Sequence, residues 1–246
     1  MSERRVKNAV LGQSQPHRRN AEATRQAILN SARLAFTRSG YDGVGVRGIA
    51  QGAGVTAMLV NRYFGSKEHL FEEVVEVTLS APGILTREVM KQGRDLATLS
   101  RNVAEALVAR TAPEVTPMDG FLILLRSAAN DQAAKILRKK FARHFERPLA
   151  DILPGRRPTE RAAVFLSVIA GFQVMRQIIG ISGLTEADPA DLSDQLQSLF
   201  ELLIGVDADQ NIRTAVVVRS AETHFINSTG DGLRTKKVRR KKGGMA

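Results

Sequence analysis

Residues 49–70 constrain the fold of this chain more than any other segment, because they read as two short helices joined by a glycine turn. Gly54 lies four residues after Ala50, and Val60 lies ten residues after it. A helix-turn-helix needs a small residue where its helices cross, a glycine at the turn and an aliphatic residue facing the core. Gly54 suits the turn because glycine adopts positive φ at little cost. This spacing predicts a helix-turn-helix, a motif that binds double-stranded DNA.

The two sides of this motif differ in the side chains that they offer. The expected buried side consists of Ile49, Ala53, Val55, Leu59 and Val60. The expected outward side consists of Thr56, Ala57, Met58, Asn61, Arg62 and Tyr63. A recognition helix needs such an outward side because it enters the major groove.

Helical patterns continue on both sides of the motif and predict an all-α fold. A first helix is expected from Asn20 or Thr24 to Ser39, with Gly40 as its C-terminal stop. Ser66 is a good N-cap for a helix that ends before Pro82-Gly83. The other predicted helices cover about 46–52, 56–64, 96–110, 118–130, 131–153, 159–181 and 189–204.

Composition removes several classes of protein. The chain has no Cys and its four His residues lack metal-ligand spacing, so we expect no disulfide, metal or cofactor. The longest apolar run, Val164 to Phe172, is about half of a membrane span, and no apolar region follows the N-terminal charges. We therefore expect a cytoplasmic protein without a membrane partner.

An enzyme is not expected either, although one glycine pattern invites the idea. Residues 43–48 fit G-x-G-x-x-G, but a helix rather than a strand precedes them. A dinucleotide site would need the strand and a βαβ unit around it. No Ser/His/Asp set or pair of carboxylates stands out.

The net charge of +11 is concentrated at the two ends of the chain. Residues 1–71 carry 11 Lys/Arg against 4 Asp/Glu, and residues 207–246 carry 9 against 4. The body between them is nearly neutral, with 16 against 17. Basic ends favour a polyanion as partner. A non-specific, nucleoid-type DNA binder driven by these ends is therefore the alternative to a sequence-specific one.

The C-terminal half offers more apolar surface than one domain core needs. The segment 159–181 is apolar on two sides, one containing Phe165 and Ile169 and the other Leu166 and Ile178. Leu192, Leu196, Leu199 and Leu203 follow as a seam of 3.5-residue period. Both helices can be core helices of a monomer, but a helix that is apolar on two sides suits a homodimer built around a four-helix bundle.

Residues 24–75, which read TRQAILNSARLAFTRSGYDGVGVRGIAQGAGVTAMLVNRYFGSKEHLFEEVV, resemble the DNA-binding domain of the TetR family of transcriptional regulators. The matching pieces are TRQAIL, GYDGV, R-x-IA-x-x-AGV and YFGSKE-x-LF. Residues 161–196 resemble the dimerising helices of some members. The pattern departs at Val44-Gly45, where members often have Thr-Ser, and at Asn61 and Tyr63, where an aromatic residue and His are frequent.

The resemblance implies a homodimer with an N-terminal three-helix DNA-binding domain and a C-terminal helical ligand-binding and dimerisation domain. We accordingly expect a disordered basic leader at 1–19, the DNA-binding domain at 20–71, the effector-binding and dimerisation domain at 72–206, and a disordered basic tail at 207–246. The implied function is sequence-specific regulation, with repression of a palindromic operator that a small-molecule effector relieves.

The DNA contacts are expected around the second helix of the motif. Thr56, Met58 and Asn61 are candidates for base edges, and Ala57 or Met58 for a thymine methyl group. Arg47, Arg62, Tyr63 and Lys67 are candidates for phosphates. The helix start at Ser66 and Lys67 adds backbone N–H groups that suit a phosphate. For the arginines a solvated charge is the competing interpretation, and for Tyr63 it is packing beneath the first helix.

The effector pocket is harder to locate in the sequence. Candidates for an apolar lining are Met90, Met118, Phe121, Leu125, Phe172 and Met175. Ordinary core packing is the competing role for each of them. The neutral body and its apolar middle favour an apolar effector.

Overall fold

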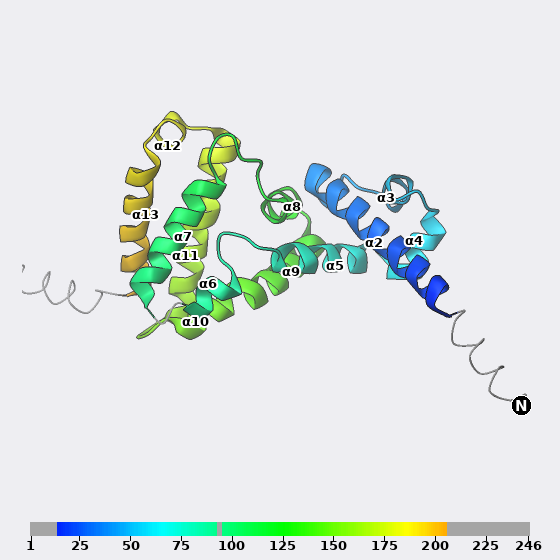
Figure 1. Cartoon of the computed structure of the whole chain (residues 1–246), viewed down its shortest axis with the longest axis horizontal. Coiled ribbons are helices and arrows are strands. Elements are labelled where there is room, and N and C mark those ends of the chain that lie inside the picture. The colour runs from blue at the N-terminus through cyan, green and yellow to red at the C-terminus, as the bar shows by residue number, and fades with distance from the viewer. Residues whose placement is uncertain (1–13, 93–94, 206–246) are drawn as a thin grey trace, which may run out of the picture. The chain divides into compact units, whose positions relative to one another are not determined.

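The computed structural model describes residues 14–92 and 95–205, and in this part of the chain the regular structure is helical throughout (Figure 1). The all-α prediction is confirmed. The expected disorder of residues 1–13 and 207–246 lies outside the described residues. The elements are α2 (Ser14–Ser39), α3 (Val46–Gly52), α4 (Ala57–Phe64), α5 (Lys67–Ser80), α6 (Arg87–Gln92), α7 (Leu96–Arg110), α8 (Asp119–Ser127), α9 (Asp131–Phe141), η1 (Ala142–Glu146), α10 (Arg147–Ile152), α11 (Pro158–Gln173), η2 (Val174–Ile179), α12 (Ser182–Thr185) and α13 (Pro189–Ile204).

Most helix boundaries follow local sequence signals. The Thr56 hydroxyl caps α4 by accepting from the Leu59 N–H at 3.3 Å, and the Ser66 hydroxyl caps α5 by accepting from the His69 N–H at 3.2 Å. Each cap satisfies a donor that the first turn of a helix leaves unpaired. At Gly45 no side chain caps α3, as the missing hydroxyl at this position predicts.

Some elements differ from the prediction. Helix α2 begins at Ser14, so residues 14–19 are helical and not part of a disordered leader. The short helices α6 and α12 were not predicted, because segments of six and four residues carry too little periodic pattern. The predicted helix 131–153 is continuous to Ile152, but its middle, η1, is a π-helical segment.

The first of two apolar cores joins the helix-turn-helix to helices that follow it in the sequence. Its centre is an aromatic group in which the Phe71 ring lies 4.9 Å from the Phe36 ring and 5.0 Å from the Tyr41 ring, edge to face in both pairs. Ile123 of α8 and Leu137 of α9 belong to the same core. Helix α5 packs against both α2 and α9. The predicted DNA-binding domain, residues 20–71, is called the head below. Its apolar packing therefore includes side chains that lie beyond residue 71.

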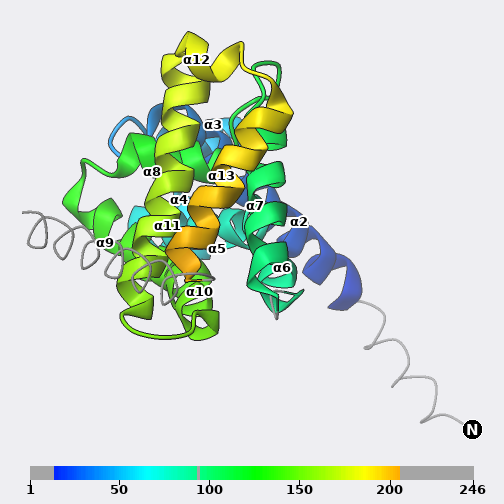
Figure 2. The same ribbon diagram turned by 90° about the vertical axis from the view of Figure 1, so that its left-hand side faces the viewer.

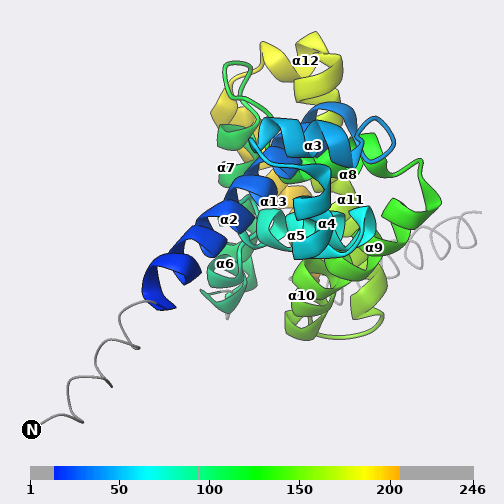
Figure 3. The same cartoon turned by 90° about the vertical axis from the view of Figure 1, so that its right-hand side faces the viewer.

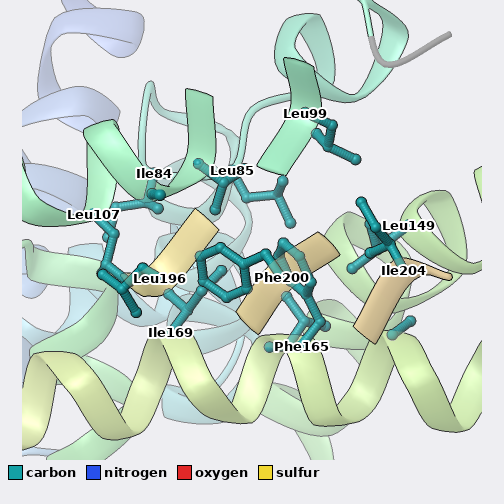
Figure 4. Packing of buried hydrophobic residues seen from close by; sticks show 14 of the residues in the cluster. Ile84, Leu85, Leu99, Leu107, Leu149, Phe165, Ile169, Leu196, Phe200 and Ile204 are labelled. Atoms are coloured by element: carbon teal, nitrogen blue, oxygen red, sulfur yellow. The ribbon is translucent and has the colours of Figure 1, made fainter. Parts of the chain in front are cut away.

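The second core lies among α7, α10, α11 and α13. Figure 2 shows α11, α13 and α7 side by side. At its centre the Phe165 and Phe200 rings are stacked with their centroids 4.2 Å apart. Figure 4 shows Phe200 beside Leu196 and Ile169 in this core. The buried face of α13 consists of Leu192, Leu196, Phe200 and Ile204.

This buried face corrects the predicted seam of α13. Leu192 and Leu196 are buried, but Leu199 is 39% exposed, and Phe200 takes the inward position instead. The inward residues are spaced four apart from Leu192 onward, so the buried side winds slowly around the 3.6-residue helix where α13 packs against α7 and does not keep to a straight 3.5-residue seam. Leu199 and the 55% exposed Leu202 face away from this core.

Helices α11 and η2 form one helical segment from Pro158 to Ile179 that is long and apolar enough to cross a membrane by length and composition. The sequence estimate was shorter because it counted only the uninterrupted apolar run. One side of the segment, including Phe165 and Ile169, is buried in the second core. Its exposed apolar residues are Val164, Met175, Ile178 and Ile179.

The C-terminal end of α2 lies beside α8 and is held by polar contacts along this α2–α8 contact (Figure 1). The Tyr41 backbone N–H donates to the Ser127 hydroxyl at 3.0 Å. The Asn130 amide donates to the Asp42 carboxylate at 2.8 Å. Closer to the N-terminus of α2, the Arg33 guanidinium donates to the Asp119 carboxylate.

Candidate DNA interface and effector cavity

The turn between α3 and α4 is held by backbone hydrogen bonds. The Val55 N–H donates to the Ala50 carbonyl at 2.9 Å, and the Ala53 N–H donates to the Ile49 carbonyl at 3.0 Å. Gly54 has φ +69°, a left-handed conformation that favours glycine. Ile49, Ala50 and Val60 are buried beneath the turn. The spacing of Ala50, Gly54 and Val60 thus produces the predicted helix-turn-helix.

Helix α4 lies beside α3 and presents its predicted outward side to solvent (Figure 3). Met58 is 80% exposed, which is unusual for a large apolar side chain. Thr56, Asn61 and Arg62 are also exposed, while Ala57 and Tyr63 are half-buried. The structure therefore brings the six predicted residues to one short helix and its cap. The Thr56 hydroxyl already accepts the capping hydrogen bond, which leaves its donor free for a base or phosphate.

The remaining DNA candidates lie at two helix starts. Arg47 is exposed in the first turn of α3. Ser66 and Lys67 are half-buried at the start of α5, where the Ser66 hydroxyl acts as the N-cap. The Lys67 ammonium lies 4.1 Å from the centre of the Tyr41 ring. This cation–π contact holds the lysine at the helix start, a role that the sequence did not indicate.

Tyr41 connects the head to the start of α5 through its hydroxyl, which donates to the Glu68 carboxylate at 3.1 Å. Burial of the ring, together with the hydrogen bond and charge of Glu68, raises the pKa of Tyr41 to about 12. A buried phenol resists ionisation because the phenolate would lose its hydration beside an existing negative charge. The tyrosine therefore stays neutral across the physiological pH range.

A cavity of about 470 Å³ lies among α2, α5, α8, α11 and the segment 81–85. Most of its wall is apolar. The lining residues are Arg33, Val77, Thr78, Leu79, Ala81, Pro82, Gly83, Ile84, Leu85, Met118, Asp119, Gly120, Phe121, Leu124, Phe141, Phe145, Leu166, Ile169, Ala170 and Gln173. A mostly apolar cavity of this size suits a small organic molecule.

Two of the six residues predicted for an effector pocket line this cavity, namely Met118 and Phe121. The other four do not. Met90 is buried in the second core, and Phe172 packs against that core. Leu125 and Met175 are exposed, at 39% and 46%. The prediction selected large apolar residues without knowing which side of each helix faces the cavity.

Arg33, Asp119 and Gln173 are polar lining residues that the sequence analysis did not select. Arg33 and Asp119 form the ion pair between α2 and α8. Gln173 is 5% exposed, and its side-chain oxygen has no hydrogen-bond partner among the described residues. The ion pair could not have been found from sequence patterns, because its two residues are separated by 86 positions in the chain.

Helix α5 is also tied to the helical segment α9–η1 by charge. The Lys140 ammonium lies 2.8 Å from the Glu76 carboxylate and 3.1 Å from that of Glu72. The buried His144 ring contributes a contact of 3.1 Å between its Nε2 atom and Glu76. Hydrogen bonds from Lys140 hold the pKa of Glu72 and of Glu76 below the usual range. These ion pairs connect α5, whose first turn belongs to the DNA-binding head, to α9 and η1 of the body.

The described residues contain no group of three or more His, Cys, Asp or Glu side chains that could hold a metal ion. In comparisons with known proteins, residues 28–74 match the family model described as bacterial regulatory proteins of the tetR family. Residues 98–204 match the model of a tetracyclin repressor-like C-terminal domain. Among curated proteins, none matches the chain.

Solved structures with the same fold include a TetR-family regulator from Rhodococcus sp., at 16% identity and a TM-score of 0.56, covering 75% of this chain and 100% of that one. NalD from Pseudomonas aeruginosa, the secondary repressor of the MexAB-OprM multidrug efflux pump, is similar at 20% identity and a TM-score of 0.53, covering 73% and 95%. The fatty acid degradation regulator FadR from Bacillus halodurans is similar at 13% identity and a TM-score of 0.54, covering 73% and 97%.

The two family models together span more than half of the chain, one over the helix-turn-helix and one over the helical body. The first match covers α3, the Gly54 turn and α4, and the second covers most of α7 and the helices that follow it to α13. The chain belongs to the TetR family of DNA-binding transcriptional regulators.

Proposed function

We propose that the chain is a cytoplasmic, homodimeric repressor that binds a palindromic operator through α4 and releases it when an apolar effector fills the cavity. The observation that carries the DNA-binding part is the exposed side of α4, with Met58 and Asn61 away from the core. A helix that presents side chains of this kind enters the major groove, and two copies in a dimer read two half-sites. We assign contacts with base edges to Thr56, Met58 and Asn61, and contact with a thymine methyl group to Ala57 or Met58. Arg47, Arg62, Tyr63, Ser66 and Lys67 are assigned to phosphates.

The dimer part is supported by exposed apolar residues on neighbouring helices, α11–η2 and α13. Val164, Ile178, Leu199 and Leu202 are 39–55% exposed, and Ile179 is 62% exposed. Contiguous apolar surface of this kind marks an interaction site. A second copy of the same two helices would complete a four-helix bundle. Ile179→Glu should therefore dissociate the dimer in sedimentation experiments, while Leu34→Glu, at an exposed apolar residue of α2, should not.

The effector part is supported by the cavity between helices of the head and the body. A ligand that binds the DNA-incompetent arrangement better must lower DNA affinity by the same factor. Some proteins of this fold are described as repressors, including the efflux-pump repressor NalD. A repressive role is the corresponding proposal for this chain.

The test is selection of binding sites from a randomised duplex pool at physiological salt, with the full chain and with a chain lacking residues 207–246. One palindromic motif that survives removal of the tail would support the sequence-specific repressor. Affinity that disappears with the tail and shows no motif would contradict it and favour the nucleoid-type binder. Operator fused to a reporter gene then distinguishes repression from activation.

A further inference from the structure

The effector cavity has a charged end that suggests the chemistry of its ligand. Among the described residues that line it, only Arg33 and Asp119 carry charge, and they are paired with each other. Arg33 lies in the middle of α2, and Asp119 is the first residue of α8. The rest of the wall is apolar apart from Thr78 and Gln173. A ligand with an apolar body and one charged group would match this wall.

The two members of the pair differ in how easily each can be released. Asp119 lies in the first turn of α8, whose N-cap, Met118, makes no side-chain hydrogen bond. A carboxylate at a helix N-terminus is stabilised by the helix dipole even without a partner. Arg33 has no such second source of stabilisation, because it lies in the interior of α2. Asp119 therefore gives up its partner more readily than Arg33 does.

We propose that the effector is an apolar carboxylic acid whose carboxylate binds Arg33 and displaces Asp119. The proposal rests on the proposed function and adds the ligand class to it. The guanidinium group can donate two parallel hydrogen bonds to a carboxylate, which a neutral group cannot accept in the same way. A cationic ligand would instead take Asp119 at the N-terminus of α8, where the positive end of the helix dipole disfavours a cation.

The exchange of partners also links the ligand to the DNA-binding head. Arg33 belongs to α2, which contacts α3 and α5, whereas Asp119 belongs to the body helix α8. When a ligand takes Arg33, the ion pair between α2 and α8 is lost. The contacts at the end of α2, from Tyr41 to Ser127 and from Asn130 to Asp42, remain. The described polar contacts that then remain between α2 and α8 all lie near the C-terminal end of α2, including that from the Arg126 guanidinium to the Thr37 carbonyl.

The experiment uses the full chain and isothermal titration calorimetry with three probes of equal chain length, namely decanoate, decan-1-ol and decylammonium, below their micelle concentrations. We expect decanoate to bind about fivefold to tenfold more tightly than decan-1-ol, because a charge-assisted hydrogen bond contributes that much at a partly exposed site. Arg33→Gln should abolish this preference, so that decanoate binds no more tightly than decan-1-ol to the variant. Asp119→Asn should increase the affinity for decanoate, because the competing carboxylate is gone.

Two further variants keep the result interpretable. Arg38→Gln, at an exposed arginine of the same helix, should preserve the preference for decanoate. Arg33→Lys keeps the charge without the planar fork and should preserve part of it, so a folding defect in Arg33→Gln can be recognised. Circular dichroism checks the fold of each variant.

Equal affinity for decanoate and decan-1-ol, tighter binding of decylammonium, or binding of none of the probes would overturn the proposal. So would a preference for decanoate that survives Arg33→Gln. Operator binding is measured with the same probes, which separates this proposal from the proposed function. Release of DNA by decan-1-ol as efficiently as by decanoate would leave the effector-controlled repressor intact and overturn only the carboxylic acid as ligand class.

Discussion

Gly40 approaches Arg126 so closely that a Cβ atom added at Gly40 would come within 2.2 Å of the Arg126 carbonyl oxygen. Gly40 also has φ +64°, so it ends α2 in a conformation that other residues adopt only with strain. The Arg126 guanidinium in turn donates to the Thr37 carbonyl in the last turn of α2. The absence of a side chain at Gly40 thus permits both the left-handed backbone that ends α2 and the close approach of α8.

Gly40→Ala should destabilise the protein, because the added methyl group meets backbone that cannot move away without opening the α2–α8 contact. Overpacking and the positive φ together predict a loss of about 2–4 kcal/mol of unfolding free energy, measured by urea titration. Gly48→Ala is the matched control, since nothing lies within 4 Å of its added Cβ and alanine favours the helix interior. Equal stability of the two variants would contradict this reading of Gly40.

Asn61→Ala should change which DNA sequence is preferred. An asparagine side chain can make a bidentate contact with adenine, so its removal should cost about 1–3 kcal/mol at one base pair of each half-site. Arg62→Gln is the control on the same exposed side of α4 and should weaken binding to all sequences alike, with a salt slope smaller by about 1. Competition binding with single base-pair variants of the selected operator measures both effects. A uniform loss for Asn61→Ala would instead assign it to a phosphate.

Stability at alkaline pH should depend on Tyr41. Its pKa is raised above the unfolded value of 10, so the neutral phenol stabilises the fold fully below pH 10 and the stabilisation is lost as the pH rises towards 12. The difference between a pKa of 10 in the unfolded chain and about 12 in the folded protein corresponds to a loss of up to about 3 kcal/mol of unfolding free energy. Tyr41→Phe should lack this alkaline loss, although it is less stable at pH 7 without the hydrogen bond to Glu68. Parallel decline of both proteins between pH 10 and 12 would argue against the prediction.

Stability at acid pH should depend on Lys140. The lowered pKa values of Glu72 and Glu76 mean that their stabilisation is present above the unfolded value of 4.5 and is lost as the pH falls through the lower folded values. Lys140→Met should lower the unfolding free energy by about 1–2 kcal/mol at pH 7 and flatten its decline below pH 4.5. Lys139→Met is the control, because the Lys139 side chain is 77% exposed and its ammonium lies 3.7 Å from the Glu72 carboxylate. Similar effects of the two substitutions would show that the contacts of Lys140 are not special.

The sequence predicted those features that depend on neighbouring residues. The turn at Gly54 and the cap at Ser66 are determined by side chains and backbone within a few positions, and the structure confirms them. The length of α7 and of α13 follows in the same way from apolar periodicity. Local signals of this kind persist because they act before tertiary packing forms.

Features that depend on distant residues could not be predicted in this way. An apolar helix such as α13 has more than one possible inward side, and only its packing against α7 turns Phe200 inward in preference to Leu199. The cavity likewise depends on which sides of α5, α8 and α11 face one another. The ion pair of Arg33 with Asp119 joins segments that carry no common motif.

The π-helical segment η2 has a consequence for how the body can vary. A π turn accommodates one residue more than an α turn, and each residue of a helix advances the side chains by about 100° around its axis. The side chains of η2, which ends the helical segment before Gly180, are therefore out of phase with those of α11. Arg176 reaches inward to the Val108 carbonyl at 2.8 Å, while Ile178 and Ile179 are exposed. Deletion of one residue within η2 would bring the end of the segment back into phase with α11 and rotate its last side chains by about 100°, so a single codon separates two different outer surfaces at this end of the helix.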